Sequence, residues 1–204
     1  MSKTNKQSVV YIDGENFIHR AIELLGKSKK QGRKDIIGLN LVDFVRKIVR
    51  VDERLEIRYY TTRVRFSAVP KKSHDKLDDI VSFNSKWLSR IGSQGVSIVR
   101  AGILRSRETD PCPKCGKVLQ YFVEKGVDVR IAVDMVTDSK NPNIESMYLL
   151  SSDLDLLPAV GLVKNNKKRV TYIASTIAVN RAMVASTSQT LTFTKRDLTE
   201  ASHD

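Results

Sequence analysis

The stretch Val9-Val10-Tyr11-Ile12-Asp13-Gly14-Glu15-Asn16 combines a short apolar run with an acidic residue and a glycine. Such a run is typical of a buried strand that leads into a helix. Asp13 would stand at the carboxyl end of that strand, and Gly14 would let the backbone turn sharply. Ligands of open parallel sheets bind beyond the carboxyl ends of the strands. The stretch therefore predicts a central strand with a carboxylate at a binding crevice, unless Asp13 only caps the helix.

Outward from this stretch, short β-branched runs alternate with longer segments of helical period, which predicts an α/β fold with a mainly parallel sheet. The helix expected over 127–136 is apolar almost all round and should be well buried. We expect residues 1–7 to be a flexible tail, 8–196 a single domain with a Cys-x-x-Cys hairpin near 105–122, and 197–204 a second flexible tail. The strands are expected at 8–12, 55–62, 96–101, 146–150, 169–174 and 190–194, and the other helices at 15–25, at 41–49 and after a cap at Ser73.

The chain is strongly basic. Thirty-five Lys and Arg against 23 Asp and Glu give a net charge of +12 over 204 residues. A balance of this kind favours nucleic acid as the partner, followed by an anionic membrane. The alternative is that the charge serves only solubility and binds no specific partner. The charge is concentrated in two segments that we expect to be loops, Lys27 to Lys34 and Lys164 to Arg169.

Two further features bear on the setting of the protein. No apolar run approaches the roughly 20 residues that cross a bilayer, and the polar N-terminus shows no secretory signal. With two cysteines only, a disulfide scaffold is excluded, and a reducing, cytoplasmic setting is expected.

A second acidic group follows the strand expected at 146–150. Proline has no backbone N–H to donate and is therefore tolerated only in the first turn of a helix. Pro158 thus places the helix start near Asp155. Asp155 would then cap the helix. Asp153 would lie in the turn before it with no capping role, so its functional interpretation is the stronger one.

Asp128 lies at the start of an apolar helical face. Burial of an ionised carboxylate there costs free energy unless a cation or hydrogen-bond donors stabilise it. Asp134 differs because Arg130 and Asp138 share its polar stripe, and an exposed ion pair with Arg130 explains it. We therefore leave Asp134 out of the site.

Asp13, Asp128 and Asp153 stand at element ends that can converge. Several carboxylates close together repel one another unless a divalent cation neutralises them. Oxygen ligands that leave room for water and phosphate suit Mg²⁺ or Mn²⁺. Such a site activates water and screens the charge of a phosphodiester during in-line attack.

Three segments, Tyr11 to Asn16, Glu124 to Val129, and Ser151 to Asp155 with Pro158 behind, resemble the NYN domain, a branch of the PIN-like nuclease superfamily. The resemblance spans roughly the first 175 residues. It implies a three-layer α/β/α sandwich and RNA as the usual substrate. It assigns the metal to Asp13, Asp128, Asp153 and Asp155, with Asn16 as a further catalytic residue that orients phosphate or a metal-bound water. Ser152 departs from the glycine that many relatives have at this position.

We therefore expect a Mg²⁺- or Mn²⁺-dependent nuclease that cuts RNA, or single-stranded DNA, and a homodimer remains an option. The alternatives are a non-catalytic nucleic-acid-binding module on the same fold, and a receiver-like phosphotransfer domain. The latter lacks the Lys that should follow the strand at 169–174. The residues expected to contact nucleic acid are Lys29, Lys30, Arg33, Lys125 and Ser152.

Cys112-Pro113-Lys114-Cys115-Gly116 is half of a zinc-ribbon signature. A structural zinc requires four ligands, and the chain has no second cysteine pair. We expect a tight turn without zinc in the monomer, and zinc at Cys112 and Cys115 is the less favoured interpretation because it needs ligands from a second chain. Trp87 is expected in the core rather than as a platform for base stacking.

Overall fold

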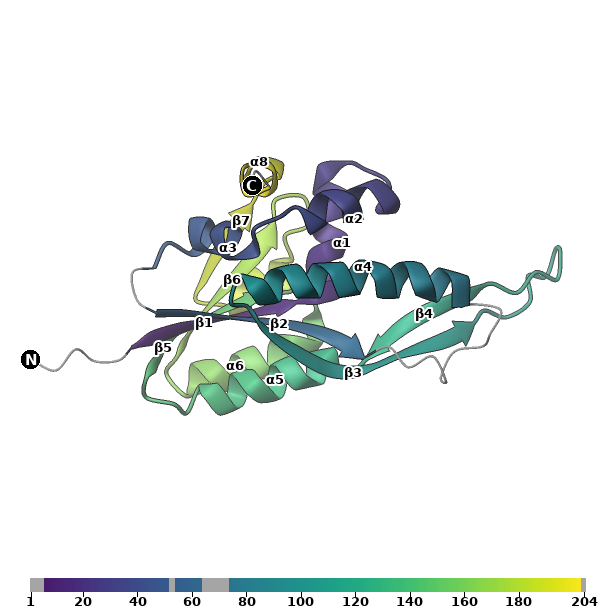
Figure 1. Cartoon of the computed structure of the whole chain (residues 1–204). Coiled ribbons are helices and arrows are strands. Elements are labelled where there is room, and N and C mark those ends of the chain that lie inside the picture. The colour runs from purple at the N-terminus through teal and green to yellow at the C-terminus, as the bar shows by residue number, and fades with distance from the viewer. Residues whose placement is uncertain (1–5, 52–53, 64–73, 203–204) are drawn as a thin grey trace, which may run out of the picture.

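The computed structural model describes residues 6–51, 54–63 and 74–202, and Figure 1 shows the arrangement of their helices around one sheet. The sheet has seven strands in the order β4-β3-β2-β1-β5-β6-β7, and every neighbouring pair is parallel except β3 and β4. The strands are β1 (Gln7–Asp13), β2 (Arg54–Arg63), β3 (Ser97–Glu108), β4 (Gln120–Lys125), β5 (Ile144–Leu150), β6 (Arg169–Ser175) and β7 (Gln189–Phe193). The predicted α/β fold with a mainly parallel sheet is confirmed.

The helices form a layer on each face of this sheet (Figure 1). The helices are α1 (Gly14–Leu25), α2 (Lys29–Ile37), α3 (Leu41–Val49), α4 (His74–Ser93), α5 (Val127–Asp138), α6 (Leu157–Asn165), α7 (Arg181–Ser186) and α8 (Lys195–Glu200), and a 3₁₀ turn, η3 (Leu154–Leu156), precedes α6. Within the described residues, no helix is both long and apolar enough to cross a membrane. The predicted helix cap Ser73 lies outside the described residues.

β1 is the central element, and its residues alternate between two cores. Val10 and Ile12 face one core with Phe17 of α1, whereas Val9 and Tyr11 face the other, all fully buried. This alternation follows from the two-residue period of a strand. Because β1 pairs with β2 on one side and β5 on the other, the strand order reverses at β1. Such a reversal opens a crevice at the carboxyl ends of the strands.

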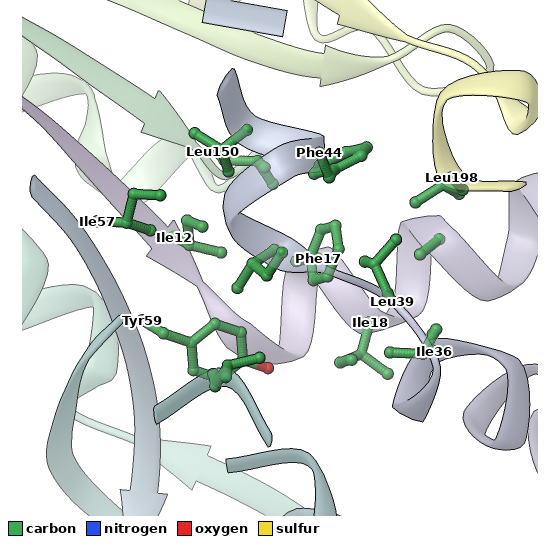
Figure 2. Packing of buried hydrophobic residues seen from close by; sticks show 14 of the residues in the cluster. Ile12, Phe17, Ile18, Ile36, Leu39, Phe44, Ile57, Tyr59, Leu150 and Leu198 are labelled. Atoms are coloured by element: carbon green, nitrogen blue, oxygen red, sulfur yellow. The ribbon is translucent and has the colours of Figure 1, made fainter. Parts of the chain in front are cut away.

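The first core is dense in aromatic rings. The ring centroids of Phe17, Phe44 and Phe193 lie 5.3 to 6.4 Å from one another, and Figure 2 shows Phe17 and Phe44 beside Leu39 and Leu198. Trp87 of α4 is 1% exposed, which confirms its placement in the core.

Two expectations about local structure are wrong. The basic segment at 27–34 is mostly helical, because Ser28 caps α2 by accepting from Gln31 N–H (3.4 Å). Gly32 then packs so closely on Ile22 that a Cβ at Gly32 would lie 2.8 Å from the isoleucine side chain. The C-terminal segment also continues past residue 196, since Thr194 caps α8 with a full capping box and Leu198 of that helix is buried.

The expectation that α5 is well buried is correct for only one of its faces, because only one face of an outer-layer helix can meet the sheet. Val129 and Val133 are 62% and 55% exposed, whereas Ile131 and Met135 are fully buried.

The side chains of Asp134 and Asp138, the acidic stripe of α5, face the sheet instead of the solvent. Asp134 does pair with Arg130 (2.8 Å), but its side chain is only 15% exposed and also accepts from the Tyr60 hydroxyl (2.9 Å). Asp138 accepts from the Tyr11 hydroxyl (2.6 Å) and from Arg58 Nη1 (2.5 Å). Burial, reinforced by these carboxylates, raises the pKa of both tyrosines, which therefore stay neutral donors. The stripe fixes α5 to β1 and β2.

Replacing Asp138 by Ala should lower the free energy of unfolding by about 2–4 kcal/mol, because Arg58 and the Tyr11 hydroxyl lose their shared acceptor in a mostly buried setting. Urea denaturation measures the change, with the exposed Asp79→Ala as a control. A loss below about 0.5 kcal/mol, the range of ordinary surface substitutions, would contradict this role.

Candidate active site

Asp13 both caps α1 and lies at the crevice. The capping interpretation and the binding-site interpretation of this residue are therefore compatible. Its Oδ1 accepts from the Asn16 N–H (3.2 Å), which caps α1. Its Oδ2 accepts from the Ser151 hydroxyl (3.0 Å). The register makes this second contact possible, because Ile12 of β1 lies opposite Leu150, the last residue of β5. Asp13 therefore joins the ends of two adjacent strands.

Gly14 is required for close packing. A Cβ at this position would lie 2.5 Å from the Tyr60 carbonyl oxygen and 2.6 Å from the Tyr59 ring. The absence of a side chain lets α1 begin directly against β2, which keeps Asp13 at the edge of the sheet.

The turn after β5 differs from the prediction in its capping residue. Asp153 is the cap, because its Oδ1 accepts from the Asp155 N–H (3.0 Å). Asp155 lies in the 3₁₀ turn that precedes α6 and does not cap α6, whereas Pro158 lies in the first turn of α6 as predicted. Asn16 reaches across to the same turn, where its Nδ2 donates to Ser152 Oγ (3.2 Å). Asn16 and Ser152 thus hold α1 against the turn after β5.

Asp128 reaches the crevice through the hairpin of β3 and β4. β4 runs antiparallel to β3, and Ile103 pairs with Lys125 at the base of the hairpin. Gly102 has a φ of 72°, and a Cβ there would lie 2.0 Å from the Lys125 carbonyl oxygen, so a larger residue does not fit. α5 begins directly after this crossing, which brings Asp128 in its first turn to the crevice.

One cavity of about 800 Å³ unites these residues. The expected metal ligands Asp13, Asp128, Asp153 and Asp155 all line it, together with Asn16. Glu15 lines it as well and was not predicted, although it lies within the first quoted stretch. No sequence pattern singles out Glu15, because a carboxylate in the first turn of a helix is explained by the helix dipole alone.

Burial and negative charge together define the electrostatics of the cavity. Burial raises the pKa of Asp13, and the Asp153 and Glu15 carboxylates raise it further, against the hydrogen bonds from Asn16 and Ser151. A divalent cation would relieve this cost, and the donors are hard oxygens, so the residues fit Mg²⁺ or Mn²⁺. Within the described residues, no three Asp, Glu, His or Cys side chains lie close enough to form a ready-made metal cluster.

Cationic side chains surround the acidic centre. Arg33 and Lys125, both predicted to bind nucleic acid, line the cavity, and so do Arg20 and His19, which were not predicted. The remaining two predicted lysines are placed differently. Lys29 lines a neighbouring cavity of about 250 Å³ that shares Arg33, His19 and Glu15 with the first, whereas Lys30 is exposed and lines neither.

The second basic segment does not contribute to the crevice. It lies where α6 ends and β6 begins. This is at the amino-terminal ends of the parallel strands, whereas Asp13 lies at their carboxyl ends. Its cations also bind within the protein, since Lys164 donates to the Ser186 carbonyl (2.8 Å) and Lys168 to the Asn141 and Ile144 carbonyls. This segment therefore lies away from the cavity that contains Asp13.

The cysteine pair forms the expected tight turn at the tip of the β3–β4 hairpin. Gly116 N–H donates to the Cys112 carbonyl (2.7 Å), and Cys112 N–H donates to the Lys117 carbonyl (3.0 Å). Hydrogen bonds from the N–H groups of Lys114 and Cys115 lower the pKa of the Cys112 thiol. Both cysteines are free thiols.

Fold and crevice together define a class, the α/β domains of the PIN-like nuclease superfamily. The family model of the NYN domain matches residues 7–194, and the chain belongs to that family. A crystal structure of a protein of unknown function from Vibrio parahaemolyticus is similar in fold, with a TM-score of 0.55 and 12% identity over 95% of this chain and 96% of the other. No curated protein matches the chain.

Asp13→Asn should raise stability at pH 7 in EDTA, because it removes a charge that burial disfavours. The pKa of Asp13 is raised in the folded protein, so its ionised form costs folding free energy above that pKa, and the gain should shrink as the pH falls toward the ordinary carboxyl pKa. Adding Mn²⁺ or Mg²⁺ should reverse the order, because an ion at 100 times its Kd adds about 2.7 kcal/mol to the wild type. Thermal unfolding measures both effects, and equal stabilisation of the two proteins by the metal would exclude Asp13 as a ligand.

Proposed function

We propose that this chain is a metal-dependent nuclease that hydrolyses phosphodiester bonds in RNA, with Mg²⁺ or Mn²⁺ as cofactor. The observation that carries the proposal is the shared cavity, which four aspartates and Asn16 line together with the cations Arg33 and Lys125. Membership of the NYN family supports nuclease activity. The two free thiols fit a reducing, cytoplasmic compartment.

The roles of the side chains follow from their contacts. Asp13, Asp128, Asp153 and Asp155 would hold the ion, and the Ser151 hydroxyl orients Asp13 for that task. An ion bound there would supply an activated water and screen the charge of the phosphate. Asn16, fixed by Ser152, directs its amide toward a phosphate oxygen or that water.

The wall of the cavity suits an unpaired strand. Phe122, Leu104 and Ile80 line it together with the carboxylates, so one cavity offers apolar and aromatic surface as well as cations for phosphate. Bases of single-stranded nucleic acid stack on such surface, whereas the bases of a duplex are hidden.

Asp13→Asn and Asp153→Asn should each reduce cleavage of single-stranded RNA by at least about 100-fold, because the lost carboxylate weakens an ion that contributes several kcal/mol to the transition state. Cleavage of labelled RNA in Mg²⁺, Mn²⁺ or EDTA measures the effect. Asp134→Asn is the matched control, since Asp134 faces β2 outside the cavity. A folded Asp153→Asn protein with full activity would remove Asp153 from the site. Metal-independent RNA binding with no cleavage by the wild type would favour the alternative of a non-catalytic binding module.

Reversing Lys29, Lys30 and Arg33 to Glu should weaken RNA binding and flatten its dependence on salt, with little change in turnover at saturation. Each lost phosphate contact lowers the log–log salt slope by about 0.7 for a single strand. Among single variants, Arg33→Glu should have the largest effect and Lys30→Glu the smallest, because only Arg33 lines the acidic cavity. Fluorescence anisotropy at several salt concentrations tests this order, and an unchanged slope in the triple variant would make α2 ordinary solvated surface.

A further inference from the structure

The hairpin of β3 and β4 carries the cysteine pair away from the rest of the sheet. The two strands pair from Ile103 and Lys125 at the base to Glu108 and Gln120, and Thr109 N–H extends the ladder to the Leu119 carbonyl (2.8 Å). Figure 1 shows the connecting turn at the far end of the hairpin, clear of the other helices and strands. The turn therefore takes no part in the crevice or in the two cores.

The turn places both cysteines within four residues of each other. The Gly116 N–H to Cys112 carbonyl bond (2.7 Å) closes it, and the Cys112 N–H donates to the Lys117 carbonyl (3.0 Å). Cys115 is exposed and Cys112 is partly exposed. Hydrogen bonds from the N–H groups of Lys114 and Cys115 and from the Cys115 side chain lower the pKa of the Cys112 thiol. A structural zinc takes four ligands in a tetrahedron, so this accessible Cys-x-x-Cys turn offers two of the four.

The other two ligands come from outside the chain that the structure describes. No group of three His, Cys, Asp or Glu exists among the described residues, so neither Glu108 nor Asp110 completes the site with the cysteines. A second copy of the chain offers the same pair at an equally accessible tip. A two-fold contact between tips supplies four thiolates, and each copy contributes the same surface, as in most homodimers.

The surroundings of the turn favour contact between two copies. Val118, Leu119 and Tyr121 are 44%, 55% and 47% exposed directly beside the cysteines, and such clustered apolar surface is typical of an interface. β4 is also an edge strand of the sheet, with one side free of a strand partner among the described residues. Lys114 and Lys117 from each copy place positive charge around a zinc with four thiolates, which carries a net charge of −2.

We propose that Cys112 and Cys115 of two chains bind one Zn²⁺ between them and so join the chains tip to tip. Neither chain has a complete site alone, and the metal defines the dimer. This proposal is independent of the proposed nuclease function.

The test uses the full chain, freed of metal with a chelator under reducing conditions and then titrated with Zn²⁺. Light scattering should show a change from one chain of 23.0 kDa to twice that mass, with saturation at about one zinc per two chains by elemental analysis. Co²⁺ in place of zinc should give the spectrum of tetrahedral four-sulfur coordination, and excess EDTA should restore the monomer.

Three variants separate this proposal from the alternatives. Cys112→Ser with Cys115→Ser should stay monomeric and unmetallated, yet should fold and cut RNA nearly as the wild type does. Asp110→Asn should dimerise normally, because a neighbouring carboxylate is not a ligand. Asp153→Asn should also dimerise normally, so failure of the nuclease site and failure of the zinc site are distinguishable. One zinc per monomer, no zinc at all, or a dimer that forms equally well in EDTA would each overturn the proposal.

Discussion

The burial of the Asp13 carboxylate at the reversal of strand order is the constraint on which the site depends. β1 is completely enclosed between β2 and β5, and its four central side chains fill both cores. A carboxylate at the end of such a strand loses much of its hydration, and the protein compensates with a backbone N–H and a serine hydroxyl. Those two contacts bind the start of α1 to the end of β5. The elements that form the cavity are thus fixed by the same atoms that keep the charge buried.

On the face of β1 that packs against α5, buried carboxylates are stabilised in a different way. There the carboxylates of Asp134 and Asp138 are almost as covered, but each is matched by a tyrosine hydroxyl and an arginine. This group is satisfied within the chain and serves to hold α5 on the sheet. In the crevice, burial and the neighbouring Asp153 and Glu15 carboxylates raise the pKa of Asp13, whose own hydrogen bonds come from a backbone N–H and a serine hydroxyl rather than from an arginine. The contrast explains why the crevice suits a divalent ion whereas the Asp134 and Asp138 group does not need one.

Position relative to the sheet also decides what the basic residues can do. The two basic segments look alike in the sequence, yet α2 brings Arg33 into the acidic cavity and onto the ring of Phe83, 5.1 Å from its centroid. The segment at 164–169 lies at the other edge, where its lysines donate to carbonyl groups that the sheet leaves open. Net charge alone describes attraction to a polyanion. The fold decides which basic side chains lie near the carboxylates, and therefore where a nucleic-acid strand would bind.

The sequence by itself determined the α/β class, the central strand at 8–12, the family resemblance, and the aspartates that line the cavity. These features follow from local period and from residues at element ends, which the chain carries in its order. Only the tertiary structure decided that Asp153 rather than Asp155 is the cap, that Asp134 and Asp138 face tyrosines, and that α5 leaves Val129 exposed. The tyrosine contacts and the exposure of Val129 depend on residues far apart in the chain. The choice of cap is a local contact between Asp153 and Asp155, but it is selected within a turn that Ser151 and Ser152 tie to Asp13 and Asn16. Local pattern gives no access to such pairings, because the free energy that selects them arises only when the layers pack.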